Sequence, residues 1–131
     1  MPQLTWIWIA VAGALGALSR WGISRAGYTL FGSGFAWGTL FANALGCFLM
    51  GFLMYVGLNT DRIPHSLRIA LSIGFLGALT TFSTFSYETV EYIKAGVWVS
   101  AIANIGANLI LSLGGTVTGL FLARTFFGGT A

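Results

Sequence analysis

Long uncharged stretches dominate the pattern of hydrophobic and polar positions along the chain. Marking every Asp, Glu, Lys and Arg leaves four largely apolar runs, which are Met1 to Ser19, Ala26 to Thr60, Ile69 to Tyr87 and Ala95 to Ala123. A helix needs about 20 mostly apolar residues to cross the hydrocarbon core of a bilayer, and each run reaches or nearly reaches that length. The pattern therefore predicts four transmembrane helices, at about residues 4–20, 35–57, 69–91 and 97–123.

The composition places the chain in the same class. Of its 131 residues 56% are hydrophobic and only 7% are charged, whereas soluble domains carry about 25% charged residues. The longest connection between the runs is Asp61 to Arg68, which is too short to form a second domain. No basic residue precedes the first run, so we expect a span there and not a cleaved signal peptide. We predict an all-α integral membrane protein with one four-helix domain over residues 1–131.

The loop charges give no preferred orientation in the membrane. Four spans place the N-terminus, the loop between the second and third spans and the C-terminus on one side. The six cations then divide equally, with Arg62, Arg68 and Arg124 on that side and Arg20, Arg25 and Lys94 on the other. A Lys and Arg excess is what sets orientation, so we expect insertion both ways round and an antiparallel, dual-topology homodimer.

Small residues four apart predict close approach between helices. This spacing lets membrane helices meet backbone to backbone. It occurs at four places, which are Gly13 and Ala17, Gly34 and Gly38, Ala42 and Gly46, and Gly115 and Gly119.

Amides and hydroxyls supply most of the polar groups inside the runs. In the fourth run they recur every four residues and so follow one helical face, as Ser100, Asn104, Asn108, Ser112 and Thr116. In the second run Asn43 is the only strongly polar side chain between Thr39 and Tyr55. Both features are compatible with interhelical hydrogen bonding and with the lining of a pore.

The third run is the least helical in character. Gly74 to Gly77 leads into the hydroxyl-rich stretch of residues 80–86, and we predict a break in the middle of the span near Gly77 to Thr80. Carbonyl groups freed at such a break are natural ligands for a small hard cation. Phe82 and Phe85 are three apart, so their rings share a face. The positive ring edges could contact an anion, although packing is the commoner role of such rings.

Four motifs in order resemble the Fluc/CrcB family of small fluoride channels over nearly the whole chain. They are the sequences of residues 13–20 (GALGALSR), 38–46 (GTLFANALG) and 74–88 (GFLGALTTFSTFSYE), and the polar fourth run. The resemblance implies an antiparallel homodimer with two pores that pass fluoride passively across the cell membrane of a prokaryote and lower cytoplasmic fluoride. It also implies a structural sodium ion held by the backbone carbonyls of Gly77 and Thr80 from both subunits.

The same resemblance implies roles for particular side chains. The fluoride pore would be lined by Asn43, Phe82, Ser83, Thr84, Phe85, Asn104, Asn108 and Ser112. Arg20 and, more weakly, Glu88 would belong to an aqueous vestibule. Asn104 departs from the family pattern, since some members carry a tyrosine at this position.

Other functions fit the sequence less well. A small dual-topology multidrug or cation exporter would be expected to carry an acidic residue inside the first span, and Met1 to Ser19 contains none. A non-conducting subunit of a membrane assembly is the second alternative, because polar stripes can simply join helices. We expect no enzyme, since the catalytic motifs are missing, and no binding to nucleic acid, since the cations are scattered.

Overall fold

The computed structural model describes residues 4–129 and consists of helices within that range. They are α1 (Thr5–Phe31), α2 (Trp37–Asn59), α3 (His65–Ile69), a π-helical segment (Ala70–Leu76), α4 (Gly77–Leu79), α5 (Phe82–Lys94) and α6 (Trp98–Phe127). By length and composition four units can cross a membrane: α1, α2, the segment His65–Lys94 and α6. The prediction of four membrane-capable helices is confirmed.

The first helix extends well beyond the predicted span of residues 4–20. It continues to Phe31, so Arg20 and Arg25 lie within the helix and not in a loop. Gly32 ends it by adopting a φ of 78°, and its N–H donates to the Tyr28 carbonyl at 2.9 Å. Two arginines do not stop a helix, because their side chains can reach solvent while the backbone bonds continue.

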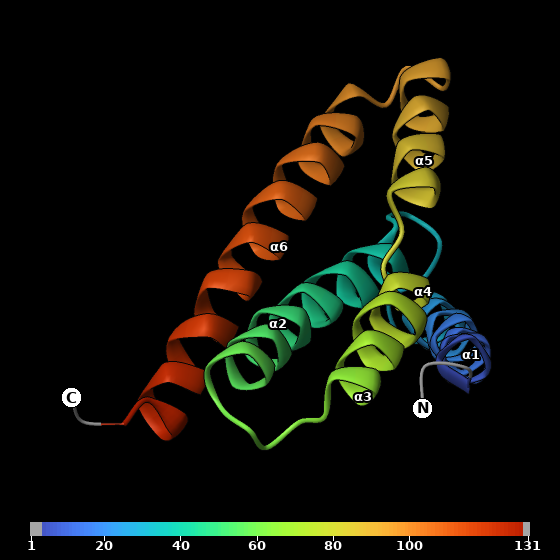
Figure 1. Cartoon of the computed structure of the whole chain (residues 1–131). Helices are drawn as coiled ribbons and strands as arrows, with labels where there is room; N and C mark the ends of the chain where they lie inside the picture. The colour runs from blue at the N-terminus through green and yellow to red at the C-terminus, as the bar shows by residue number, and fades with distance from the viewer. Residues whose placement is uncertain (1–3, 130–131) are drawn as a thin grey trace.

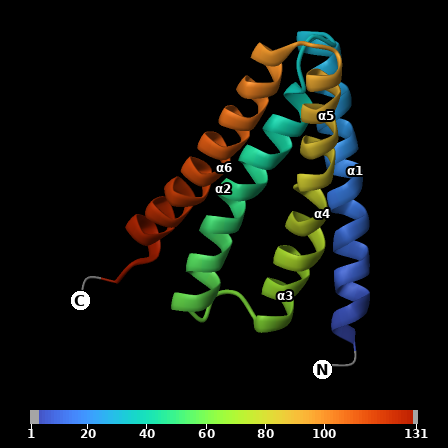
Figure 2. The ribbon, with the colours of Figure 1, turned by 90° about the horizontal axis from the view of Figure 1, so that it is seen from above.

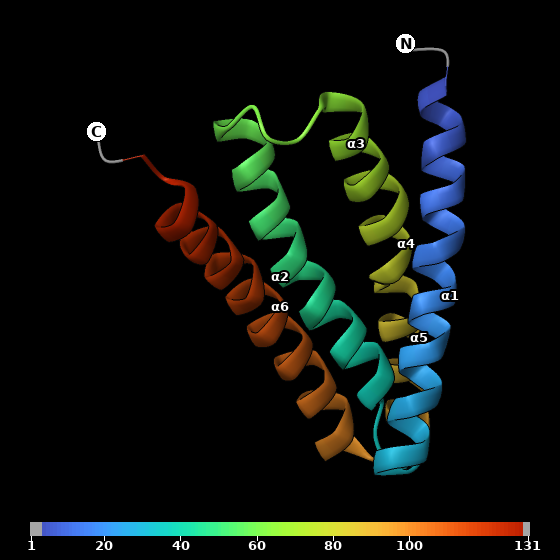
Figure 3. The same ribbon diagram turned by 90° about the horizontal axis from the view of Figure 1, so that it is seen from below.

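The four units lie side by side in the order α6, α2, the α3 to α5 segment and α1 (Figure 3). The α1–α2 and α5–α6 connections meet at one end of the molecule. The start of α1, the α2–α3 connection and the end of α6 lie at the other, where the helices splay apart (Figure 2). This arrangement agrees with the sidedness expected of four successive spans.

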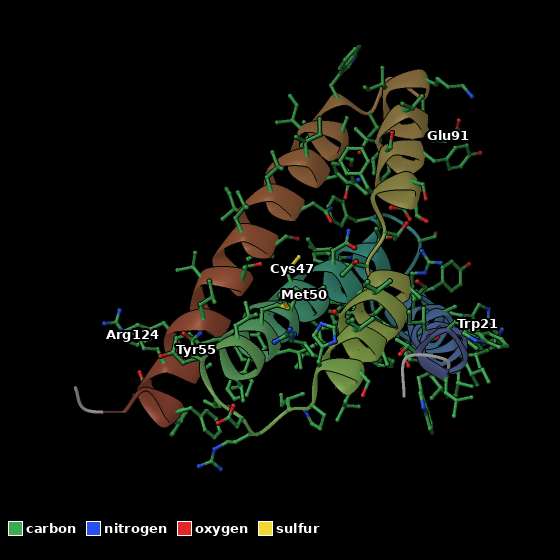
Figure 4. The ribbon with its side chains drawn as sticks, in the orientation of Figure 1. Trp21, Cys47, Met50, Tyr55, Glu91 and Arg124 are labelled. Carbon is green, nitrogen blue, oxygen red and sulfur yellow. The ribbon has the colours of Figure 1, made fainter. Side chains whose placement is uncertain are left out.

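Helix α2 is the centre of the structure. It contacts both outer helices, and Ala42 and Leu53 join Leu76 and Leu79 of the third unit in the buried apolar core. Figure 4 shows Cys47 and Met50 in the middle of the molecule, whereas Trp21 and Arg124 lie at opposite outer edges.

Large apolar side chains cover the outer faces. Exposed examples are Trp6, Leu18, Leu30, Val99, Ile110, Leu113 and Phe121. Soluble monomers rarely expose apolar surface on this scale, so these faces need lipid or protein cover. The chain is a multi-pass membrane protein.

Glycines on α6 bring it into close contact with α2. A Cβ atom at Gly119 would overlap the Phe48 carbonyl, and one at Gly115 would come within 3.0 Å of the Ala44 carbonyl. This small-residue pair therefore acts as the spacing predicts. In the pair Gly34 and Gly38 only the second residue makes such a contact: a Cβ atom at Gly38 would overlap the backbone of Ser24 in α1, whereas Gly34 meets nothing within 4 Å.

Substitution at this contact should destabilise the fold. The change Gly119→Ala places a methyl group against backbone atoms that cannot move aside, and overpacking of this kind costs about 1–3 kcal/mol. Gly114→Ala is the matched control, since Gly114 lies on the same helix and faces open space. Thermal unfolding of the detergent-solubilised protein should give a lower midpoint for the first variant only. Equal midpoints would show that the glycine contact does not matter.

Candidate functional site

The third unit is interrupted at Thr80 and Thr81. Both residues have extended backbone, with φ and ψ of −82° and 155° for Thr80 and of −152° and 119° for Thr81. Helix α4 ends just before them and α5 begins just after them, as the thin link between the two helices in Figure 1 shows. The sequence predicted a break near Gly77 to Thr80; the structure keeps Gly77 helical and puts the extended residues at Thr80 and Thr81.

Asn43 of α2 satisfies the backbone at this interruption. Its Oδ1 accepts a hydrogen bond from the Thr81 N–H at 2.7 Å, and its Nδ2 donates to the Thr81 carbonyl at 3.1 Å. Asn43 is only 9% exposed and Thr81 only 7%. An unpaired buried peptide group costs about 1–3 kcal/mol. The Asn43 amide avoids this cost by bonding to both the N–H and the carbonyl of Thr81, as the backbone of a neighbouring strand would. Asn43 therefore makes interhelical hydrogen bonds, the first of the two roles expected from the sequence. The second role, in the lining of a pore, depends on its other contacts.

The side chain of Thr81 caps the following helix. Its Oγ1 accepts from the Thr84 N–H at 3.1 Å, donates to the Thr84 Oγ1 at 3.0 Å and lies 3.3 Å from the Ser83 Oγ. This is the usual side-chain cap of a helix N-terminus. Ser83 and Thr84, both predicted pore residues, thus gather around the cap. Neither is among the residues that line the cavities described below.

Two carbonyl groups lose their helical partners as a result. In a continuous helix the Thr81 N–H would bond to the Gly77 carbonyl and the Thr84 N–H to the Thr80 carbonyl. Here the first donor bonds to Asn43 and the second to the Thr81 hydroxyl. Gly77 is also exposed on the surface of the chain. Free backbone oxygens are suitable ligands for a hard cation, so Gly77 and Thr80 fit the predicted sodium site.

A chain of buried amides leads away from Asn43. Asn43 Nδ2 donates to Asn108 Oδ1 at 2.9 Å, and Asn108 Nδ2 donates to both the Oδ1 and the carbonyl oxygen of Asn104, each at 3.0 Å. Asn104 Nδ2 donates to Thr89 Oγ1 at 3.0 Å, and that hydroxyl donates to the Phe85 carbonyl at 2.8 Å. We call these four side chains (Asn43, Asn108, Asn104 and Thr89) the amide ladder.

The polar residues of the fourth span do not all face the same neighbouring helix. Asn104 points to α5, whereas the Thr116 hydroxyl lies 3.3 Å from the Cys47 carbonyl of α2 and 3.1 Å from the Ser112 carbonyl of its own helix. Asn104 is 0% exposed and is not among the cavity-lining residues, so its position differs from that of a pore-lining side chain. For this part of the fourth span the structure shows interhelical hydrogen bonds.

Phe82 and Phe85 lie between two cavities. The first, of about 260 Å³, is lined by Asn43, Cys47, Thr80, Thr81, Phe82, Phe85, Asn108, Leu109, Ser112 and Leu113. The second, of about 340 Å³, is lined by Phe82, Phe85, Ser86, Thr89, Val90, Ile105 and Leu109. The two ring centroids are 5.4 Å apart, with 63° between the planes. Phe82 is 77% exposed and Phe85 9% exposed, so one ring is free to meet an ion or a partner while the other is fixed.

Glu88 lies apart from these cavities. Its Oε1 accepts from the Thr39 hydroxyl at 2.7 Å, and its Oε2 is buried without a hydrogen-bond partner among residues 4–129. Both residues line a cavity of about 260 Å³ at the α1–α2 connection. Arg20, the other predicted vestibule residue, does not line it.

Three threonines make hydrogen bonds described above but were not predicted as site residues from the sequence. They are Thr39, Thr81 and Thr89. The signal for Thr81 was present, since a threonine immediately before the first apolar residue of a helical segment is a common helix start. Thr39 and Thr89 act through neighbours on other helices, which no spacing within one helix reveals.

Comparisons with known proteins cover this whole region. A family model described as "CrcB-like protein, Camphor Resistance (CrcB)" matches residues 7–120. A protein of Geobacter metallireducens named "Fluoride-specific ion channel FluC" is 46% identical over 122 residues, which cover 93% of this chain and 98% of that protein. A protein of the same name from Dehalococcoides mccartyi is 49% identical over 105 residues, or 80% of this chain and 81% of that one. Another, from Geobacter sulfurreducens, is 46% identical over 116 residues, or 88% and 94%.

Proposed function

The chain belongs to the CrcB family, and we propose on that basis that it is a fluoride-selective channel that passes fluoride down its gradient. The observation that carries this conclusion is the similarity to relatives named as fluoride channels over almost their full length. The function follows from the family, and the cavity beside the helix interruption supplies a physical reason for it.

The first cavity has the chemistry that an anion path needs. Asn43, Asn108 and Ser112 provide polar groups, and two phenylalanine rings provide weakly positive edges. No Lys, Arg, Asp or Glu is among the lining residues. Conduction requires sites that bind an ion weakly enough to release it, and neutral polar groups and ring edges meet that condition better than a fixed cation. The amide hydrogens of Asn43 and Asn108 already bond within the protein, so the Ser112 hydroxyl and the ring edges are the groups free to meet the ion.

The working unit in this proposal is an antiparallel dimer with a structural sodium ion. Equal numbers of cations on the two sides support dual insertion, and the exposed Gly77 supports a second copy packed against the interruption. Carbonyls of Gly77 and Thr80 from both copies would then supply an oxygen cage, and sodium would balance their partial charges. Because Thr80 and Thr81 lie near the middle of the segment His65–Lys94, we place the break at mid-membrane, in a prokaryotic cell membrane.

The alternatives have less support. A small exporter of this kind would be expected to carry an acidic residue inside its first span, and α1 contains neither Asp nor Glu. A non-conducting subunit remains compatible with the interhelical hydrogen bonds, so only a flux measurement on the purified protein separates it from a channel.

The function is tested by fluoride efflux from liposomes that contain the purified chain alone. Fluoride-loaded vesicles with a potassium ionophore should release fluoride rapidly to an external electrode, whereas chloride-loaded vesicles of the same preparation should release almost none. Equal release of both anions would contradict selectivity. Release of neither would favour the non-conducting subunit.

The two rings should be required for flux. Phe82→Ile and Phe85→Ile keep apolar bulk but remove the ring edge. With the about 0.5–1.5 kcal/mol of an aromatic ring pair taken as the scale of one edge contact, we expect efflux to fall about threefold to tenfold. Phe126→Ile is the control, because Phe126 is 73% exposed at the end of α6 and lines neither cavity. Wild-type efflux in both pore variants would exclude their role in the path.

A further inference from the structure

The direction of the amide ladder is fixed at both ends. At one end the Thr81 N–H can only donate and the Thr81 carbonyl can only accept, so Asn43 has one possible orientation. At the other end the Thr89 hydroxyl donates to the Phe85 carbonyl, which leaves the Thr89 oxygen to accept from Asn104. Asn104 must then point its nitrogen toward Thr89 of α5, and Asn108 must point its nitrogen toward Asn104.

Every side-chain oxygen of the three asparagines is occupied in this arrangement. Asn43 Oδ1 accepts from the Thr81 N–H, Asn108 Oδ1 from Asn43, and Asn104 Oδ1 from Asn108. An amide oxygen carries partial negative charge, and an unoccupied one beside a pore would repel an anion. Occupied oxygens leave the wall of the cavity free of this repulsion.

We infer that Thr89 and Asn104 are positioning residues that act through Asn108 to keep its amide oxygen bonded to Asn43, which holds the Asn43 amide in place beside the ion path. This inference rests on the proposed fluoride function. Asn108 lines the first cavity, whereas Asn104 is fully buried behind it. Thr89 touches the second cavity only, and acts on the first through Asn104.

Loss of the Thr89 hydroxyl would release the far end of the ladder. Asn104 would keep an amide nitrogen without an acceptor in a buried position, and turning the amide over would bring its nitrogen against that of Asn108. Two facing donors repel, so Asn108 turns as well. Its oxygen then leaves Asn43 and accepts from Asn104 instead, so the Asn43 amide loses the acceptor that holds it in the wall of the cavity.

The test is fluoride efflux from liposomes by Thr89→Val, which keeps the side-chain volume and removes the hydroxyl. We expect efflux to slow about threefold to tenfold, the range that loss of one or two interhelical hydrogen bonds gives in a membrane. Thr118→Val is the matched control. The Thr118 hydroxyl bonds the carbonyl four residues earlier, as that of Thr89 does, but it is exposed and receives no amide donor. It should conduct within about 1.5-fold of wild type, a change below that of one such bond.

Two comparisons separate positioning from a merely structural role. Thr89→Ser restores the hydroxyl without the methyl group and should recover most of the wild-type rate. In an Asn108→Ser background there is no amide left to orient, so Thr89→Val should cause no further loss. If the Asn108→Ser protein conducts too slowly to measure, the efflux of Thr89→Ser alone decides between a positioning role and a structural one.

Three results would overturn the inference. They are wild-type efflux by Thr89→Val, failure of Thr89→Ser to recover flux, and an undiminished effect of Thr89→Val in the Asn108→Ser background. If Thr89→Val does not fold, judged by gel filtration, Thr89→Cys replaces it as a variant with a weak acceptor, under the same expectations. Absence of fluoride efflux from the wild-type chain is a different outcome, since it would remove the proposed function itself.

Discussion

The pairing of Asn43 with the backbone of Thr81 is the interaction on which the rest of this structure depends. Extended backbone inside a membrane-spanning segment exposes peptide groups that lipid cannot satisfy, and each unsatisfied group costs several kcal/mol. One side-chain amide on the central helix bonds to both the N–H and the carbonyl of the same residue. The N–H and the carbonyl of Thr81 are therefore satisfied although the helix is interrupted at this point.

The other features of the site follow from this interruption. Because Thr81 N–H is used by Asn43, the Gly77 carbonyl becomes free, and because the Thr81 hydroxyl caps α5, the Thr80 carbonyl becomes free as well. The new start of α5 places Phe82 in its first turn, beside the cavity that Asn43 lines. The proposed cation site and the proposed anion path would thus share a single structural cause.

The sequence predicted the outline of this arrangement better than its internal contacts. Charge-free runs reveal membrane helices because a charge in hydrocarbon is costly, and glycines with hydroxyls mark the break to within about one residue. Asn43, Phe82, Phe85, Asn108 and Ser112 do meet around one cavity. The burial of Asn104 could not be read, because a polar residue on a helical face looks the same whether a pore or another helix covers it.

Other differences have similar physical origins. Ser83 and Thr84 belong to a helix cap because the local geometry of the break, and not the helical period, decides where their hydroxyls point. The π-helical segment Ala70–Leu76, in which Gly74 packs closely against the backbone of α1, has no clear sequence signal. Predicted spans end at charges, whereas α1 ends at a glycine turn.

Hydrogen exchange at the Thr81 amide tests the central pairing most directly. Measured by NMR, Thr81 N–H should be protected in the wild-type protein and should exchange about tenfold faster in Asn43→Ala, because its buried hydrogen bond is lost. The Thr60 N–H, which bonds to the Val56 carbonyl, serves as the internal reference and should exchange at the same rate in both proteins. Unchanged protection of Thr81 in the variant would show that Asn43 does not hold the interruption, and would contradict this account.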